Sequence, residues 1–152
     1  MKTKMKDKTV TLLIVYITLI CLTIFTANLL SSSLIINREI NSQFLDILFA
    51  NILICLSTIP IRLQLRKNEF LFCRIILIVV AALLLGGFVW SYYNNWIRYI
   101  YHECFLGGKA PTITEMWSFV ILDIEYVSLL FSTIACIRKQ ARGDNYSTEA
   151  IN

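Results

Sequence analysis

Charged residues are scarce in this sequence. They make up 16% of the 152 residues, whereas 57% of the residues are hydrophobic. An average soluble domain has about 25% charged residues. A core built from a chain of this length could not hide so much apolar surface from water. The composition therefore excludes an ordinary soluble domain and indicates an integral membrane protein.

The sequence also lacks the residue groupings of metal and redox sites. It has one histidine, His102, and five cysteines without a Cys-x-x-Cys motif. A metal site needs several ligands close together, and a thiol oxidoreductase needs paired cysteines. We expect the cysteines to be packing residues, with Cys104 alone at the outer membrane interface. No nucleic-acid module is recognisable, so we predict no catalytic residue, no cofactor, no metal ion and no nucleic-acid partner.

Long uncharged stretches are what the sequence has instead. Residues 9–30 and 75–97 carry no charge, and neither does the interval between Asp46 and Arg62. A helix that crosses a bilayer needs about 20 apolar residues. We predict one all-α domain over residues 1–152, in which four transmembrane helices form a bundle. The predicted helices cover about residues 9–30, 44–61, 75–94 and 114–137.

Local signals indicate where these helices begin and end. The run over 9–30 is too long for a cleavable signal peptide, so it should remain as an anchor. Pro60 should break the second helix near its end. Pro111 precedes a capping box in which Thr112 is the N-cap and Glu115 the acid three residues later. The polar tail, about residues 143–152, should be disordered.

The positive charges predict the topology. Eleven of the 14 Lys and Arg residues fall in the N-terminal head, the second loop and the tail, and three fall in the other loops. Because cytoplasmic loops carry the excess of Lys and Arg, both termini should be cytoplasmic. The eleven are Lys2, Lys4, Lys6, Lys8, Arg62, Arg66, Lys67, Arg74, Arg138, Lys139 and Arg142. The three are Arg38, Arg98 and Lys109.

The segment between the third and fourth helices is amphipathic. On an α-helix, one face of residues 95–105 is mostly apolar and the other polar. We predict a short interfacial helix in the outer headgroup layer, which Gly107 and Gly108 end. Its apolar face holds Trp96, Ile97, Ile100, Tyr101, Cys104 and Phe105. Its polar face holds Asn95, Arg98, Tyr99, His102 and Glu103. Trp90, Trp96 and Trp117 would form an aromatic belt at this interface.

The candidate functional site is a group of polar side chains in the outer half of the membrane. Asp123 and Glu125 lie about 10 and 13 Å deep if the fourth helix enters near Met116. Asp46, Asn51 and Asn28 should lie in the same half. Such acids are costly in lipid and are by default a functional-site hypothesis. The alternative is that these groups only hold helices together, at under about 1 kcal/mol per hydrogen bond.

Helical geometry separates the two deep acids. Two residues correspond to about 200° of rotation, so Asp123 and Glu125 cannot face one neighbour. One should face the bundle, with Asn51 or Asp46 as its partner. The other should face outward, toward a partner protein, a second copy or the interface. The small-residue pairs Ala82/Gly86 and Thr23/Ala27 should pack within the chain.

Two function classes follow from these features. The first is a non-enzymatic protein that acts by intramembrane contact with another integral membrane protein or a second copy. In layout and size the chain looks like the polytopic immunity proteins that protect bacteria from pore-forming colicins, which implies a bacterial inner-membrane location. The second is a proton-coupled transporter of small molecules or ions that works as an oligomer through Asp123 or Glu125.

Comparison with other four-helix membrane proteins narrows the choice. Small multidrug carriers have their essential acid in the first helix, and residues 9–30 contain none. Lipoprotein signal peptidases share the four-helix plan, and Asp46 with Asp123 could imitate their carboxylate pair. Their Asn-x-x-Asp signatures are missing from this sequence, so we predict that the chain is not an enzyme.

Overall fold

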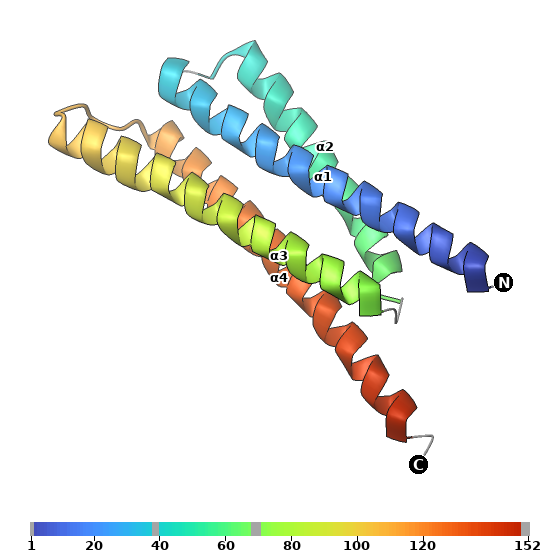
Figure 1. The fold of residues 1–152 in the computed structure, drawn as a ribbon. Helices are drawn as coiled ribbons and strands as arrows, with labels where there is room; N and C mark the ends of the chain where they lie inside the picture. Colours follow the sequence, from blue (N-terminus) through green and yellow to red (C-terminus); the bar gives the residue numbers. More distant parts are fainter. Residues whose placement is uncertain (1, 38–39, 68–70, 150–152) are drawn as a thin grey trace.

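The computed structural model describes residues 2–37, 40–67 and 71–149, with the backbone alone for 2–6 and 143–149. These residues form α1 (Lys2–Asn37), α2 (Ser42–Leu65), α3 (Leu71–Tyr92), η1 (Tyr93–Leu106) and α4 (Ile113–Glu149) (Figure 1). Four helical stretches in the described chain are long and apolar enough to cross a membrane. They are Asp7–Asn37, Ser42–Leu65, Leu71–Leu106 and Ile113–Arg142.

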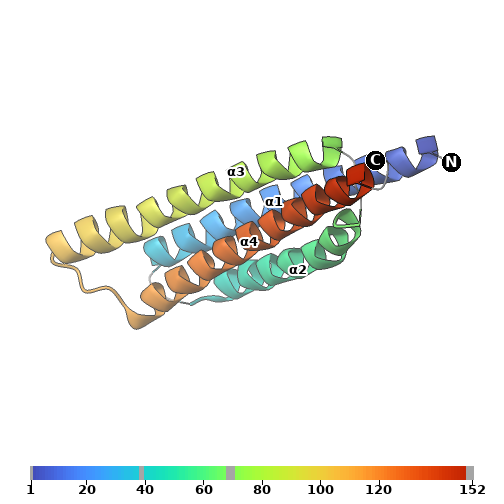
Figure 2. The same ribbon diagram turned by 90° about the horizontal axis from the view of Figure 1, so that it is seen from below.

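The helices pack as two antiparallel pairs. α1 lies along α2, and α3 lies along α4 (Figure 1), while α1 also packs against α3 and so joins the pairs (Figure 2). By contrast, α2 and α4 touch each other over a short length. The start of α1 and the end of α4 lie at the same end of the bundle (Figure 2). This arrangement leaves the side of the bundle between α2 and α4 less tightly closed than the others.

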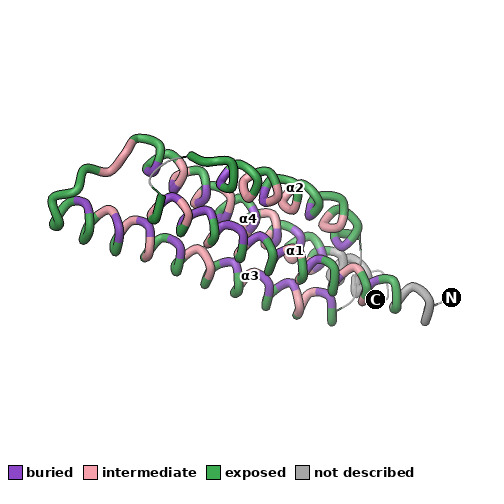
Figure 3. The backbone as a smooth tube through the Cα atoms, turned by 90° about the horizontal axis from the view of Figure 1, so that it is seen from above, coloured by how far each residue is buried: buried purple, intermediate pink, exposed green. Residues whose placement is uncertain are grey.

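Apolar side chains occupy both the inside and the outside of the bundle. On α3, for example, Leu77, Val80 and Leu84 are fully buried at helical spacing. Phe25, Phe49 and many similar side chains are exposed on the outer faces. Buried positions follow one side of each helix in Figure 3, and exposed positions follow the other. An apolar exterior on helices of this length suits contact with lipid, where helices satisfy their own backbone hydrogen bonds.

The helices are longer than predicted. Pro60 does not break α2, which continues to Leu65, where the amide of Arg66 still donates to the carbonyl of Arg62 at 2.9 Å. Because Pro60 has no backbone N–H, the carbonyl of Leu56, four residues earlier, receives no helical hydrogen bond from it. Pro60 lies on an exposed side of α2. The predicted helix end was therefore wrong by about one turn.

The capping box at the start of α4 is confirmed. Thr112 Oγ1 accepts a hydrogen bond from the Glu115 amide at 3.2 Å, and Glu115 Oε2 accepts one from the Thr112 amide at 2.9 Å. Tyr99 also donates to Glu115 Oε1 at 3.0 Å, and Glu115 is fully buried. The far end of α4 differs from expectation. The helix continues to Glu149 instead of ending in a disordered tail at about 143, and 150–152 lie outside the described residues.

The predicted interfacial segment 95–105 is helical but is not a separate helix. It belongs to η1, a π-helix that continues α3 without a break (Figure 1). The predicted faces were wrong, because Asn95, Tyr99 and Cys104 are all buried. Hydrogen bonds from residue i to i+5 widen each turn, so residues four or five apart share a side. Cys104 therefore lies inside the bundle instead of forming an interfacial thiol.

Two glycines end η1, as the sequence predicts. The Gly107 amide donates to the His102 carbonyl, five residues earlier, at 3.0 Å. A Cβ atom on Gly107 would clash with the carbonyl oxygen of Glu103. Gly108 has a φ of 74°, a backbone conformation that other residues rarely adopt. The chain can therefore leave η1 here and return into α4.

Only one of the two small-residue pairs packs inside the chain. Thr23 and Ala27 on α1 are each 1% exposed. Ala82 and Gly86 on α3 are exposed, and a Cβ atom on Gly86 would meet no atom within 4 Å. The close approach occurs one residue later, where a Cβ atom on Gly87 would lie 3.0 Å from Tyr126 Cε1 of α4. Intrachain packing of Ala82 and Gly86 was thus a wrong prediction.

Candidate functional site

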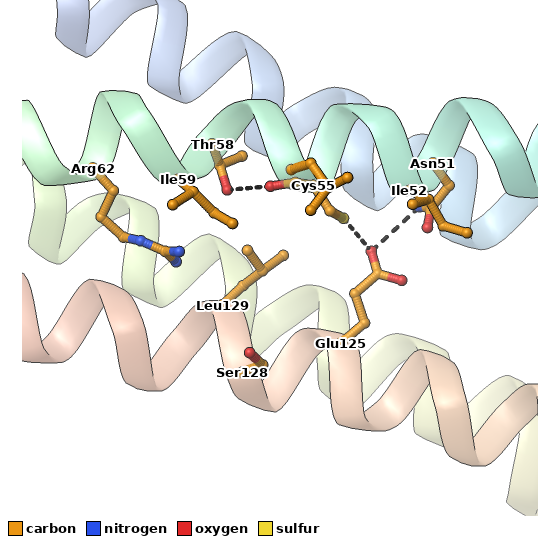
Figure 4. Close-up of a pocket in the computed structure, with 10 residues that line it drawn as sticks. Asn51, Ile52, Cys55, Thr58, Ile59, Arg62, Glu125, Ser128 and Leu129 are labelled. Atoms are coloured by element: carbon orange, nitrogen blue, oxygen red, sulfur yellow. Dashed lines mark hydrogen bonds between the residues drawn. The ribbon is translucent and has the colours of Figure 1, made fainter.

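The carboxylate of Glu125 joins α4 to α2. Its Oε1 atom accepts a hydrogen bond from Cys55 Sγ at 2.9 Å and another from Asn51 Nδ2 at 3.3 Å (Figure 4). Asn51 and Cys55 are four residues apart on α2, so both point to the same neighbour. Among the described residues, no hydrogen bond to the Oε2 atom of Glu125 is present, so half of this carboxylate keeps its capacity to accept hydrogen bonds.

The same cluster extends to α1. Asn51 Nδ2 also donates to Thr26 Oγ1 at 2.8 Å, and Thr23 Oγ1 lies 3.9 Å from Cys55 Sγ. Asn51 is 2% exposed and Thr23 is 1% exposed. Side chains of three helices therefore meet at one level of the bundle. The hydrogen bonds offset part of the cost of keeping Glu125 away from water.

A cleft between α2 and α4 opens beside Glu125. Its volume is about 240 Å³, and Glu125, Cys55, Ile59, Arg62 and Ser128 are among the residues that line it. Figure 4 shows the Glu125 carboxylate reaching across to α2, while the Arg62 side chain extends from α2 toward α4. The cleft thus has an acid from one wall and a base from the other.

Arg62 has unused hydrogen-bonding capacity. Its Nη1 atom is buried and has no hydrogen-bond partner in the part of the chain that the structure describes. The guanidinium lies near the Tyr16 hydroxyl, which in turn shares a 2.8 Å hydrogen bond with Thr133 Oγ1. A buried polar atom without a partner costs about 1 to 3 kcal/mol, and more for a charged group. An additional acceptor in the cleft would remove that cost.

Asp123 lies on the other side of α4. Its Oδ2 atom accepts a hydrogen bond from the indole nitrogen of Trp96 at 2.7 Å, and its Oδ1 atom is buried without a described partner. The prediction that the two acids face different neighbours agrees with this arrangement. However, Asp123 does not face outward, because η1 supplies a donor on that side. We predicted that Trp96 lies on a separate interfacial helix. The sequence therefore contained no indication that its indole would reach Asp123.

The remaining candidates lie apart from this cluster. Asp46 is exposed near the start of α2, and none of the described residues makes a hydrogen bond or ion pair with it. Asn28 donates to the carbonyl of Ile24 on its own helix at 2.8 Å. The structure therefore groups Asn51 with Glu125, and it separates both from Asp46, Asn28 and Asp123.

Sequence reasoning missed Thr26, Cys55 and Arg62 as participants in the site. Cys55 was expected to be a packing residue, although its spacing of four residues from Asn51 places both on one face. Arg62 was assigned only to topology. All five cysteines are free, and no group of three or more His, Cys, Asp or Glu that could hold a metal occurs among the described residues. The cluster offers hydrogen bonds and charge.

Comparisons with known proteins add no relative. No protein family, curated protein or solved structure matches this sequence. The function must therefore be argued from the helices and side chains themselves.

Proposed function

We propose that this chain is a non-enzymatic membrane protein that binds a transmembrane helix of another integral membrane protein. The proposed contact is the cleft between α2 and α4. The observation that supports it is that Glu125 and Arg62, which both line the cleft, keep unused hydrogen-bonding capacity: among the described residues, only Oε1 of Glu125 accepts hydrogen bonds, and Nη1 of Arg62 is buried without a partner. Polar groups on the protein side of an intramembrane cleft favour a partner that supplies the missing donor and acceptor.

The chemistry of the partner helix follows from these two groups. The Glu125 carboxyl group can accept a hydrogen bond from a donor or bind a cation, and the Arg62 guanidinium can donate to an acceptor or bind an anion. Cys55, which contacts Glu125, lies seven residues before Arg62, so the two sites are about 10 Å apart along α2. A partner helix would therefore carry a donor and an acceptor about seven residues apart on one face.

The membrane arrangement belongs to the same proposal. Both termini would lie in the cytoplasm of a bacterial inner membrane, and the end of the bundle that carries η1 would lie at the outer surface. The excess of Lys and Arg at the opposite end supports this orientation. The resemblance in layout to colicin immunity proteins supports a pore-forming toxin as the partner, since such a toxin presents helices within the inner membrane.

Affinity purification from mild detergent tests the proposal. The wild-type protein should retain a membrane partner in stoichiometric amount, and Glu125→Gln should lose it because an NH2 donor then replaces one carboxyl oxygen. Asp123→Asn is the matched control on the same helix, because Trp96 already bonds that carboxylate. Asp46→Asn is an exposed control. Both controls should keep the partner.

The site of contact needs its own measurement. A photo-crosslinking side chain at Ile59, which lines the cleft, should form adducts with a transmembrane segment of the partner. The same group at Ile124, which is 62% exposed and does not line the cleft, should not. Absence of a partner from the wild-type protein, or equal crosslinking from both positions, would overturn the proposal.

A second candidate function is a proton-coupled carrier that works through Glu125. The observation in its favour is that hydrogen-bonded polar side chains continue along the bundle from Glu125 toward the end that is rich in Lys and Arg. Tyr16 shares a hydrogen bond with Thr133 at 2.8 Å, and Gln140 donates to the Leu65 carbonyl at 2.9 Å. Proton flux into vesicles separates the two functions. A carrier would lose flux in Glu125→Gln and keep it in Glu125→Asp, whereas an interaction protein gives no flux in any form.

A further inference from the structure

A second cavity lies at the other end of the bundle, between α1 and the continuous helix of α3 and η1. Its volume is about 520 Å³. The polar side chains on its walls include Asn28, Ser31 and Ser32 on α1 and Asn95, Arg98 and Glu103 on η1. The α2–α4 cleft shares none of these residues, so the two cavities can be tested separately.

Two side chains of opposite charge line this cavity without forming an ion pair with each other. Arg98 and Glu103 are five residues apart on η1, which is one turn of a π-helix, so both reach the same side. Both are exposed, and no ion pair between them or with another described residue is present within 4.0 Å. The cavity therefore offers a separate cation and a separate anion to a ligand.

Asn95 adds an unused acceptor to the wall. It is 0% exposed, and its Nδ2 atom donates to Ser31 Oγ at 3.1 Å and to Ser91 Oγ at 3.2 Å. Its Oδ1 atom is buried and has no partner among the described residues. On the exposed part of the wall, the carboxylate of Glu103 suits a ligand with N–H donors, and the guanidinium of Arg98 suits a phosphate, which it can bind through two parallel hydrogen bonds.

Exposed apolar residues also line this cavity. Ile36 and Trp90 line it and are 77% and 60% exposed. We infer that this cavity binds the phosphoethanolamine headgroup of phosphatidylethanolamine. The phosphate lies against Arg98, the ammonium against Glu103, and the first part of the acyl chains along Ile36 and Trp90. The inference requires this end of the bundle to lie at the headgroup layer, as in the proposed topology, but it does not depend on the partner helix.

The charge pattern distinguishes this lipid from others. Phosphatidylglycerol has a phosphate but no cation, so Glu103 would remain unpaired near an anion. Phosphatidylcholine has a cation without N–H donors, and such groups are bound by aromatic cages. The cavity instead offers carboxylate and amide oxygens, which accept hydrogen bonds from a primary ammonium.

Native mass spectrometry of the intact protein in detergent, titrated with each of the three lipids, tests the inference. Wild-type protein should retain phosphatidylethanolamine about tenfold more tightly than the other two. Arg98→Gln should weaken the binding of phosphatidylethanolamine and phosphatidylglycerol alike, because both lose the phosphate contact. Glu103→Gln should weaken phosphatidylethanolamine alone and so reduce its preference over phosphatidylglycerol.

Two controls make the test specific. Lys109→Gln and Asp46→Asn remove exposed charges that do not line the cavity, and both should bind the lipids as the wild type does. Soluble glycerophosphoethanolamine should bind far more weakly than the diacyl lipid, because it lacks acyl chains. Equal retention of all three lipids, an equal loss in the controls, or tight binding of the soluble headgroup would each overturn the assignment.

Discussion

The thiol of Cys55 on α2 donates a hydrogen bond to the carboxylate of Glu125 on α4 at 2.9 Å. This bond crosses the side of the bundle where the two helices otherwise have little contact. Asn51 reinforces it and also reaches α1 through Thr26. The cluster therefore holds α2 in place beside a cleft, and the same carboxylate that stabilises the fold borders the proposed binding surface.

The coupling between Asn51 and Glu125 is measurable. We expect Asn51→Ala and Glu125→Ala to interact in a double-mutant cycle by about 0.6 kcal/mol, the average for hydrogen bonds between transmembrane helices, and by no more than about 1.7 kcal/mol. The free energy of unfolding in mixed micelles gives the values. Asp46→Ala paired with Asn51→Ala is the control and should be additive within about 0.5 kcal/mol. A coupling of zero for the first pair would contradict this hydrogen bond.

The bond between Trp96 and Asp123 makes a second prediction. Trp96→Phe removes the only described donor to a carboxylate whose other oxygen is already buried without a partner. We expect a loss of about 1 to 3 kcal/mol in the free energy of unfolding. Adding Asp123→Leu should restore much of it, because both polar groups are then gone. Trp117→Phe, at a residue 64% exposed, should cost little, and a similar loss there would contradict the assignment.

The number and approximate position of the helices were predictable from the sequence because lipid imposes a simple rule on length and hydropathy. The capping box of Thr112 and Glu115 was predictable because it depends on residues three apart. Asn51 was named as a partner for a deep acid because few polar residues were available at that depth. These predictions needed only local spacing and composition.

The rest depends on how helices face one another, which local spacing does not determine. The π-helical geometry of η1 changes which of residues 95–105 are buried. It also places the indole of Trp96 within hydrogen-bond distance of Asp123. Cys55 and Arg62 become site residues only because α4 lies opposite them. Asp46 has the charge expected of a site residue, but it projects from an exposed face near the start of α2.

Adjacent glycines on α3 supply a matched test of the packing. Gly87 faces α4, where an added Cβ atom would lie 3.0 Å from Tyr126 Cε1, whereas one on Gly86 would meet nothing within 4 Å. We expect Gly87→Leu to destabilise the protein by about 1 to 3 kcal/mol through overpacking. Gly86→Leu should be neutral or slightly stabilising, because it removes a flexible residue from a helix. Equal effects on unfolding in micelles would show that α3 is rotated differently.

Topology can be tested with single cysteines at the two ends of the bundle. In intact cells, a membrane-impermeant maleimide should label Lys109→Cys and leave Lys67→Cys unlabelled until the cells are opened. The reason is that most Lys and Arg residues, Lys67 among them, should remain in the cytoplasm. The native thiols give little background, because Cys21 is exposed only within a membrane-length helix and the others are buried or half-buried. Labelling of Lys67→Cys in intact cells would show that the protein has the opposite orientation. It would also move the cavity of Arg98 and Glu103 to the cytoplasmic leaflet, so this measurement decides which leaflet should supply its lipid.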